Sequence, residues 1–328
     1  MKNDNDYSSF EIAVMIPCYN ENKTIVKVIQ DFQRELPDAT IIVFDNNSTD
    51  GSYDLAVNAG AKVIKEKRQG KGFVISSMFN DVVADIYVLV DGDDTYPAEY
   101  VHELIAPVMN GEADMMVGQR LSRYAKNAFR PIHYRGNKLV CNLINMIFSS
   151  NLKDPMSGYR AFNRKVVMEI PIVATGFDVE TEMTLQMLYR HFKIMEIEIP
   201  YRERPKGSYS KLHTFKDGSK VIYKILSILQ SYKPLTFFGG IGLFLVLIGI
   251  LVGLFVIREY VIFTSTFSVL KAILSGGLIS IGVLSATVGI ILHTLNFRLL
   301  ELSSNNAKMF ALLNSSCARS EAQKFEDE

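Results

Sequence analysis

The chain has 328 residues, which is enough for one large domain and an appendage. Lysine plus arginine total 35 and aspartate plus glutamate total 35, so the formal net charge is zero and no global positive field favours nucleic acid as a partner. The three cysteines, Cys18, Cys141 and Cys317, lie far apart. This spacing argues against a disulfide framework or a cysteine metal site and is typical of a reducing cytosolic face.

The first two thirds of the chain alternate short apolar runs with longer amphipathic stretches. The apolar runs are Ile12 to Ile16, Ile41 to Phe44, Ile86 to Val90 and Met115 to Val117, and helical patterns follow at Lys23 to Leu36 and Ala98 to Met109. Continuous apolar strands that alternate with helices are typical of a parallel sheet covered on both faces. We therefore predict an α/β domain over residues 1–212, with ligands at the carboxyl ends of its strands.

Residues 213–233 predict an amphipathic helix. Val221, Ile225 and Leu229 belong to an apolar stripe, whereas Lys220 and Lys224 lie on the opposite face. Such a helix suits an anionic membrane surface, and the alternative is an ordinary surface helix packed on the sheet. Its position directly before a long apolar segment favours the interfacial interpretation.

Two long segments that follow are almost free of charge. Leu235 to Ile257 has no charged residue, and Ala272 to Phe297 has none except the titratable His293. At about 1.5 Å per residue, each can cross a hydrocarbon core of roughly 30 Å. We therefore predict an antiparallel hairpin of two transmembrane helices within residues 234–300.

Positive charges flank this hairpin unevenly. Four lysines precede the first span within residues 216–233, whereas the link between the spans carries only Arg258 and Lys271. The bias predicts that residues 1–212 and the tail at 301–328 both lie on the cytoplasmic side of the cytoplasmic membrane. The tail is polar and ends acidic, so we expect it to be partly disordered.

An acidic motif follows the third apolar run, in the sequence Val88-Leu89-Val90-Asp91-Gly92-Asp93-Asp94-Thr95. Residues two apart in a strand share a side, so Asp91 and Asp93 are expected to face the same way. Two carboxylates at this spacing can hold Mg²⁺ or Mn²⁺ while phosphate oxygens fill the other coordination positions. A helix-capping turn would explain Asp94 but hardly three acids, which favours a metal site.

Polar side chains also follow the first two apolar runs. Ile16-Pro17-Cys18-Tyr19-Asn20-Glu21 offers a ring that could stack on a base and a carboxylate that could bind a ribose. Phe44-Asp45-Asn46-Asn47-Ser48-Thr49-Asp50-Gly51 offers hydrogen-bonding groups to a nucleobase. A ligand role is favoured for Asp45, whereas Asp50 fits a ligand role and a helix-capping role equally well.

Three further segments suggest contacts with phosphate groups. In Gln69-Gly70-Lys71-Gly72 the glycines allow close approach to a ligand and the lysine can face phosphate, although the spacing differs from that of a nucleoside-triphosphatase loop. Asp154 precedes a proline and is either an acid–base or orienting group or a simple turn residue. The basic run from Tyr201 to Lys211 suits an anionic lipid headgroup.

These six motifs, in the order in which they occur along the chain, resemble those of family 2 glycosyltransferases of the GT-A fold. Within that family the chain resembles the polyprenyl-phosphate glycosyltransferases, which include dolichyl-phosphate mannose synthase and bacterial undecaprenyl-phosphate sugar transferases. The likeness covers essentially the whole chain. It implies a Rossmann-like nucleotide-sugar-binding domain that transfers a hexose-type sugar, with inversion, from a nucleotide diphosphate sugar to a polyprenyl phosphate. A membrane-tethered glycosyltransferase that acts on a glycan or a protein is the alternative.

The resemblance also implies roles for individual residues. Contacts to the nucleotide are implied for Pro17, Tyr19, Glu21 and Asp45, and metal binding is implied for Asp91 and Asp93. Phosphate contacts are implied for Arg120 and Arg135, the acceptor-side segment contains Asp154, Gly158 and Arg160, and the loop that closes over the site contains Arg202, Ser208 and Lys211. We predict Asp93, Asp154 and Arg135 as catalytic residues, and we expect Lys71 to help neutralise the leaving diphosphate.

Several features depart from the family pattern. Asn46 replaces a usual second acid, which predicts altered base recognition, and Thr95 replaces a frequent glutamine, which puts a third protein ligand to the metal in doubt. The chain has no tryptophan, which argues against a processive polysaccharide synthase. A UDP-sugar donor is favoured over a GDP-sugar. Small residues in the spans could pack between subunits of a homo-oligomer: Gly239, Gly240, Gly276 and Gly277.

Overall fold

The computed structural model of the protein describes residues 10–120, 131–176, 178–205, 226–227, 229–263 and 269–326, and it describes their side chains except at 131–135, 263, 300 and 303–326. The chain divides into two compact units, Met1–Gly218 and Ser219–Glu328. Most of the predicted interfacial helix lies outside the described residues, as do Ser208 and Lys211 of the basic run.

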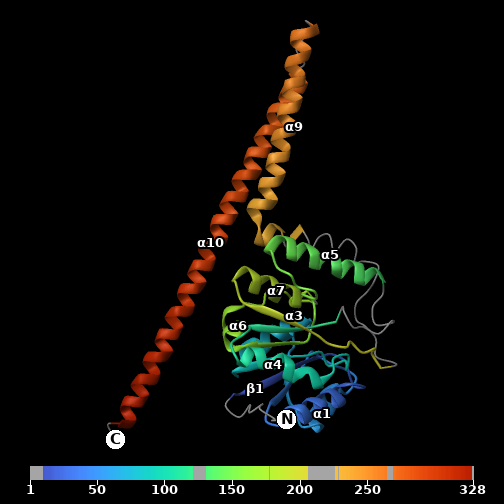
Figure 1. Ribbon diagram of the computed structural model, residues 1–328, viewed down its shortest axis with the longest axis vertical. Coiled ribbons are helices and arrows are strands. Elements are labelled where there is room, and N and C mark those ends of the chain that lie inside the picture. The colour runs from blue at the N-terminus through green and yellow to red at the C-terminus, as the bar shows by residue number, and fades with distance from the viewer. Residues whose placement is uncertain are drawn as a thin grey trace. The chain divides into compact units, whose positions relative to one another are not determined.

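The first unit is built on a seven-stranded sheet with the strand order β3-β2-β1-β4-β6-β5-β7 (Figure 1). Its strands are β1 (Ile12–Cys18), β2 (Thr40–Asp45), β3 (Lys62–Lys65), β4 (Ile86–Leu89), β5 (Met115–Gln119), β6 (Arg160–Asn163) and β7 (Ile194–Glu198). The four strands predicted from apolar runs are confirmed as β1, β2, β4 and β5.

The sheet is mixed, so the expectation of an all-parallel sheet is wrong at β6. Strand β6 runs antiparallel to both of its neighbours, β4 and β5, whereas the other pairs are parallel. The reason is where the chain enters this strand. Arg160, the first residue of β6, pairs with Leu89, the last residue of β4, so β6 starts at the edge where β4 ends and has to run backwards along it.

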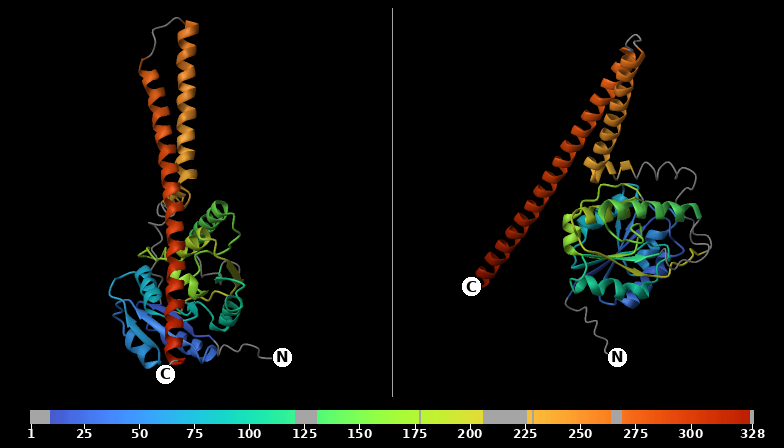
Figure 2. Two further views of the ribbon diagram at one scale, coloured as in Figure 1. Left: turned by 90° about the vertical axis from the view of Figure 1, so that its left-hand side faces the viewer. Right: turned by 45° about the horizontal axis from the view of Figure 1, so that its top comes forward.

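Helices cover both faces of the sheet, as the α/β class requires (Figures 1 and 2). On one face lie α1 (Ile25–Glu35), α2 (Ser52–Asn58), the short 3₁₀ helix η1 (Ala98–Tyr100) and α4 (Val101–Met109); on the other lie α3 (Lys71–Asp81), α6 (Arg164–Glu169) and α7 (Val179–Tyr189), and α5 (Pro131–Phe148) contacts α7. Because side chains alternate along a strand, Val88 and Leu89 in β4 pack into opposite layers, and both are fully buried.

The order of strands creates a topological switch point, the crevice, at the carboxyl ends of β1 and β4. Strand β1 has β2 on one side and β4 on the other. The chain runs from β1 to β2, but from β4 it runs away from β1, so the two connections diverge. Ligands of α/β sheets bind at such a switch point. Asn20, Asn47 and Asp94 follow these three strands with φ of 53°, 63° and 57°. Asn and Asp tolerate this left-handed conformation better than other residues with side chains, which lets the chain turn immediately after each strand.

The second unit contains the long helices α9 (Pro234–Phe263) and α10 (Val269–Glu326), and α10 packs beside α9 (Figures 1 and 2). Pro234–Ile262 and Val269–Leu299 are long and apolar enough to cross a membrane, as judged by length and composition. Only 17% and 11% of their most apolar stretches are buried within the structure, whereas the core helix of a soluble protein would be mostly buried.

Small residues let the two helices approach closely. A Cβ atom on Gly242 would lie 2.5 Å from the carbonyl oxygen of Gly282, and the Ser275 hydroxyl donates to the Gly249 carbonyl at 2.7 Å. No heavy atom of the other described helix lies within 4 Å of the position of a Cβ on Gly240, Gly276 or Gly277. These three glycines therefore take no part in the contact between α9 and α10, and packing between subunits stays a prediction.

Helix α10 continues to Glu326, which differs from the partial disorder expected after residue 301. The chain contains no glycine and no proline after Gly289. Without a helix-breaking residue, the helical hydrogen-bond pattern can propagate beyond the apolar part.

Candidate active site

The acidic pair lies at the mouth of the crevice, in the turn that follows β4. The hydrogen-bonded strand ends at Leu89, so Asp91 and Asp93 lie outside it. The expectation that they face the same way because of strand alternation is therefore wrong in its reason. Asp91 Oδ1 accepts from Lys71 Nζ at 2.5 Å, and Asp93 Oδ2 pairs with the guanidinium of Arg204. Each carboxylate of the pair is therefore met by a cation from another part of the chain.

The pKa values of the two carboxylates shift in opposite directions because their charged neighbours differ. Burial raises the pKa of Asp93, and the negative charge of Asp91 raises it further. Burial also opposes ionisation of Asp91, but the nearby Lys71 ammonium outweighs it and lowers the pKa of Asp91. Repulsion between the two carboxylates is the kind of strain that a bound divalent cation relieves.

The donor set fits Mg²⁺ or Mn²⁺ shared with a phosphate-bearing ligand. No three His, Cys, Asp or Glu side chains converge to hold an ion anywhere in the described ranges, so a metal on Asp91 and Asp93 would take its remaining oxygens from ligand or water. The Thr95 hydroxyl donates to Asp93 Oδ1 at 2.6 Å. Thr95 thus orients one acid of the pair. A Cβ on Gly158 would lie 2.7 Å from Asp91 Oδ2, so only glycine leaves room here.

Lys71 was expected to face a phosphate group. In the structure its ammonium instead bridges two carboxylates. Its ammonium lies 2.5 Å from Asp91 Oδ1 and 2.5 Å from Glu180 Oε1, and its side chain is 12% exposed. Burial lowers the pKa of Lys71, but the two carboxylates outweigh burial and the net shift is upward. Lys71 therefore stays charged beside the acidic pair.

The glycines around Lys71 admit another stretch of backbone, and the expectation that they admit a ligand is corrected. A Cβ on Gly72 would lie 1.8 Å from the Ala174 carbonyl oxygen, and one on Gly70 would lie 2.2 Å from the Thr175 carbonyl oxygen. Any side chain at either position would collide with the segment that leads into α7. This segment is what requires glycine at both positions.

Asp45 has a buried carboxylate oxygen that is suited to bind a ligand. The residue is 2% exposed, its Oδ2 accepts from the Ser48 backbone N–H, and its Oδ1 has no hydrogen-bond partner within the described part of the chain. A buried carboxylate oxygen is rarely left unpaired, so it suits an N–H group of a bound base. Pro17 is half-buried nearby at the end of β1, the Tyr19 side chain is 37% exposed, and Glu21 lies 3.9 Å from Arg204.

Asn46 was expected to alter base recognition. Its side chain instead forms hydrogen bonds to the loop at residues 66–70. Its amide nitrogen donates to the carbonyls of Glu66 at 2.9 Å and Arg68 at 2.7 Å. Its amide oxygen accepts from Gly70 N–H at 2.8 Å and from the Gln69 side chain at 3.2 Å. A carboxylate could not donate to two carbonyls, which explains an amide at this position.

Asp50, which the sequence left equally open to capping or ligand binding, also has a structural role. Its carboxylate accepts from the backbone N–H groups of Asn22 and Ser52 and from the Ser52 hydroxyl. These contacts tie the loop after β1 to the start of α2.

Asp154 and Arg120 form a buried bidentate pair. Asp154 is 0% exposed; its Oδ2 accepts from Arg120 Nε at 2.8 Å and its Oδ1 from Arg120 Nη2 at 3.0 Å. Glu196 supports the pair by accepting the backbone N–H groups of Lys153 and Asp154 at 2.7 and 2.8 Å. With both of its oxygens engaged, Asp154 is suited to orient Arg120 rather than to take a proton.

Arg160 is not placed to meet a phosphate, which corrects the role implied by the resemblance. It is fully buried, and its guanidinium donates to Thr184, Met115 and the carbonyls of Ser157, Pro155 and Glu180. All five of its N–H groups are thereby taken up by the protein. Arg160 holds the segment after Asp154 against α7.

The remaining predicted cations divide between the site and its surroundings. Arg204 reaches the acidic pair, whereas Arg202 pairs with Glu99 at 2.7 Å. Arg135 lies in α5, but its side chain falls outside the described residues. The basic run thus contributes a cation to the site, although a different arginine from the one expected.

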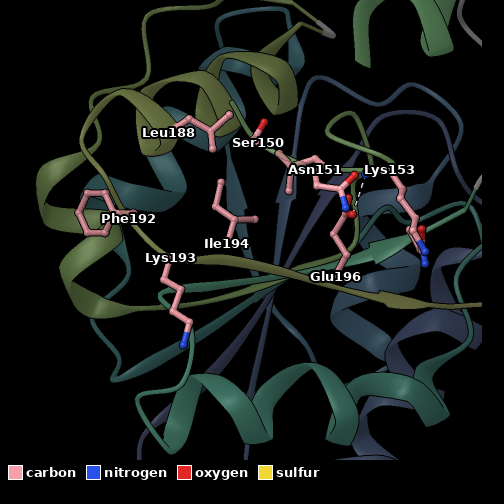
Figure 3. Close-up of a pocket in the computed structure, with 10 residues that line it drawn as sticks. Ser150, Asn151, Lys153, Leu188, Phe192, Lys193, Ile194 and Glu196 are labelled. Atoms are coloured by element: carbon pink, nitrogen blue, oxygen red, sulfur yellow. Dashed lines mark hydrogen bonds between the residues drawn. The ribbon is translucent and has the colours of Figure 1, made fainter. Parts of the chain in front are cut away.

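A pocket of about 530 Å³ is lined in part by the residues just before Asp154 and does not include the acidic pair (Figure 3). Its walls include Ser150, Lys153, Phe192, Ile194 and Glu196. Burial raises the pKa of Glu196. Its side chain lines this pocket and also accepts the backbone N–H of Asp154.

Comparisons with known proteins agree with this arrangement. The profile of the family described as "Glycosyl transferase family 2" matches residues 13–171. Glycosyltransferase AglJ of Haloferax volcanii is 30% identical over 82% of this chain and 88% of its own. A dolichyl-phosphate hexose transferase of the same organism is 28% identical over 68% of this chain and 96% of its own. Dolichol-phosphate mannosyltransferase of Pyrococcus furiosus is 25% identical over 71% of this chain and 68% of its own.

A solved structure shares the fold of the first unit. Glucosyl-3-phosphoglycerate synthase from Mycobacterium tuberculosis, crystallised with Mn²⁺, UDP-glucose and phosphoglyceric acid, matches with a TM-score of 0.56 and 21% identity over 69% of this chain and 80% of that one. The chain belongs to glycosyltransferase family 2, and its first unit has the GT-A fold.

Sequence reasoning missed three residues that the structure brings to the site. Arg204 lay within the basic run already recognised, so a signal for it existed. Glu180 is the second residue of a helix that mixes apolar, polar and acidic residues, and Glu196 alternates with apolar residues in an edge strand; neither pattern distinguishes them from surface acids.

Replacement of Asn46 with aspartate tests the loop anchor. Asn46→Asp is expected to lower the stability of the protein by about 1 to 3 kcal/mol, because the buried carbonyl of Glu66 and the half-buried carbonyl of Arg68 lose their donor and face a carboxylate. Asn142→Asp is the control, since Asn142 is exposed on α5 and lies far in the sequence from this loop. Thermal unfolding of both variants in detergent checks this expectation, and equal melting temperatures would contradict the role of Asn46.

Proposed function

We propose that this enzyme transfers a hexose-type sugar from a nucleotide diphosphate sugar to a polyprenyl phosphate at the cytoplasmic face of a membrane. The observation that carries the proposal is the convergence of Asp91 and Asp93 with Lys71, Arg120 and Arg204 in a chain that continues into two long apolar helices. Relatives named as dolichyl-phosphate hexose transferase and dolichol-phosphate mannosyltransferase support the choice of acceptor.

On the donor side, Asp91 and Asp93 would hold Mg²⁺ or Mn²⁺ against the diphosphate. When bound, the ion stabilises the negative charge that develops on the leaving diphosphate. The unpaired Oδ1 of Asp45 would accept an N–H group of the base, and Pro17, Tyr19 and Glu21 lie at or just after the end of the neighbouring strand β1. A UDP-sugar is the favoured donor, because a solved structure with this fold was crystallised with Mn²⁺ and UDP-glucose.

On the acceptor side, the nucleophile needs a position more than a base. The second pKa of a phosphate monoester is about 6, so a polyprenyl phosphate is largely dianionic at neutral pH. One of its oxygens attacks the anomeric carbon, the bond from that carbon to the diphosphate breaks, and the configuration inverts. Arg120, held by Asp154, and the arginines at 202 and 204 supply positive charge for this phosphate.

The membrane parts would keep the catalytic unit at the height of a lipid phosphate. We assign residues 1–212 to the catalytic domain, 213–233 to an interfacial helix, 234–300 to two spans and 301–328 to a cytoplasmic tail. The excess of lysines before the first span supports a cytoplasmic location of the catalytic domain. A polyprenyl chain cannot leave the bilayer, so the enzyme has to meet its phosphate at the surface.

A donor screen tests the proposal directly. Full-length protein in nanodiscs, given undecaprenyl phosphate and Mn²⁺ or Mg²⁺, is expected to release UDP from a UDP-hexose and to place labelled sugar in the organic phase. Asp91→Asn should lower the rate by about 100-fold or more, since disturbing even the support of a metal ligand costs 10- to 100-fold. Asp81→Asn, an exposed acid at the end of α3, is the control. Label that stays with protein or glycan would favour the alternative acceptor.

Truncation separates the two units. Removal of residues 234–328 should abolish transfer to polyprenyl phosphate in vesicles while binding of the nucleotide sugar survives, because the acceptor would remain beyond reach. Binding is measured by calorimetry and transfer by extraction of labelled lipid. Transfer at the full rate by the truncated protein would overturn the role of the apolar helices.

The pH profile tests the role of Asp154. Asp154→Asn is expected to lower the rate by about 10- to 100-fold, because a misplaced Arg120 costs orientation. The rate of both proteins should rise with pH through about 6, as the acceptor phosphate loses its second proton. Loss of that rise in the variant alone would identify Asp154 as a general base.

A further inference from the structure

The Lys71 ammonium lies between two carboxylates that come from different elements. Asp91 belongs to the turn after β4, and Glu180 is the second residue of α7. Lys71 Nζ is 2.5 Å from an oxygen of each, and the side chains of Lys71 and Glu180 are 12% and 6% exposed. Glu180 is therefore connected to the acidic pair through a buried cation.

Both ends of this bridge are held rigidly. Lys71 is the first residue of α3, and the backbone at Ala174 presses against Gly72, so this end of the helix cannot shift without a collision. The carbonyl of Glu180 accepts from Arg160 Nη2 at 2.9 Å and from the Thr184 hydroxyl at 3.0 Å. The bridge is thus part of the framework of the crevice and not a chance surface contact.

The segment between the two ends is fixed to α7 as well. The Glu182 carboxylate accepts from the backbone N–H groups of Val173 and Ala174 at 3.2 and 2.7 Å. Because Ala174 is the residue that touches Gly72, this contact ties the start of α3 to the start of α7. Lys71 and Glu180 are therefore kept in register.

Charge decides what the bridge does. A lysine ammonium paired with Asp91 alone would neutralise that carboxylate and compete with a divalent cation for it. Glu180 supplies a second negative charge, so that Lys71 and Glu180 together contribute no net charge beside Asp91. The carboxylate of Asp91 then keeps its attraction for a cation.

We propose that Glu180 is a positioning residue of the candidate metal site: it balances the charge of Lys71 and thereby keeps Asp91 able to bind a divalent cation. The inference rests on the proposed function, because it takes Asp91 and Asp93 as metal ligands. Glu180 acts on the metal through Lys71 and not by coordinating it.

Binding of Mn²⁺ tests this inference without reference to turnover. Full-length protein in detergent, with UDP present, is titrated with Mn²⁺, and the free ion is measured by electron paramagnetic resonance. Glu180→Gln is expected to raise the Kd for Mn²⁺ by about tenfold or more, since one negative charge beside the site is lost. Glu103→Gln on α4, an exposed acid, should leave the Kd unchanged. A Glu180→Gln value within twofold of the wild type would overturn the proposal.

A compensating variant separates charge balance from direct contact or mere structure. Glu180→Gln combined with Lys71→Gln again contributes no net charge, so its Kd for Mn²⁺ should return to within about threefold of the wild type. A double variant that binds Mn²⁺ as weakly as Glu180→Gln would overturn the proposal. Melting temperatures identify any variant that fails to fold, and the single variant with its control then decides.

Two further outcomes distinguish this inference from the function on which it rests. If Glu180→Gln weakens binding of UDP-glucose but not of Mn²⁺ with UDP, Glu180 contacts the sugar and the proposal is wrong. If the wild type and Asp91→Asn bind Mn²⁺ equally weakly, the metal site itself is wrong and the proposed function has to be revised.

Discussion

Burial disfavours the ionised forms of Asp91 and Asp93, the two carboxylates after β4. Cations from distant parts of the chain make their burial possible. Lys71 from α3 meets Asp91, and Arg204 from the segment after β7 meets Asp93. A buried charge without a partner would cost several kcal/mol, so these contacts are a condition for the crevice to exist in this form. The same contacts bring helices α3 and α7, the turn after β4 and the basic run to one place.

Close backbone approaches give the crevice its shape. Gly72 lies against Ala174, and Gly158 lies against the carboxylate of Asp91. Asn46 fixes the loop that leads into Lys71 by making four hydrogen bonds with its side chain. Charged groups can be held at contact distance only if the segments that carry them are rigid, and these three residues provide that rigidity.

The two units of the chain suit two different solvents. The GT-A unit buries apolar residues on both faces of its sheet, so its core is complete without a membrane. Helices α9 and α10 instead expose most of their apolar side chains and contact each other through small residues. A chain that combines both surfaces is suited to chemistry at a lipid–water boundary, which agrees with the acceptor proposed above.

The sequence by itself determined the fold class, the four strands with continuous apolar runs, the two apolar helices and the acidic pair. These features are local, because each depends on the composition or spacing of residues close together in the chain. Strands β3, β6 and β7 escaped prediction, since none of them contains more than two consecutive apolar residues. Arg160 and Lys71 were placed in the right region, but a basic side chain near a motif does not reveal its partners.

Only the tertiary structure decided which partners meet. Glu180 lies about a hundred residues after Lys71 in the chain, yet the two side chains are in contact because α3 and α7 pack on the same face of the sheet. The direction of β6 and the pairing of Asp154 with Arg120 were likewise set by contacts between distant segments. Such contacts arise from packing and charge compensation in three dimensions, which a local pattern of residues does not encode.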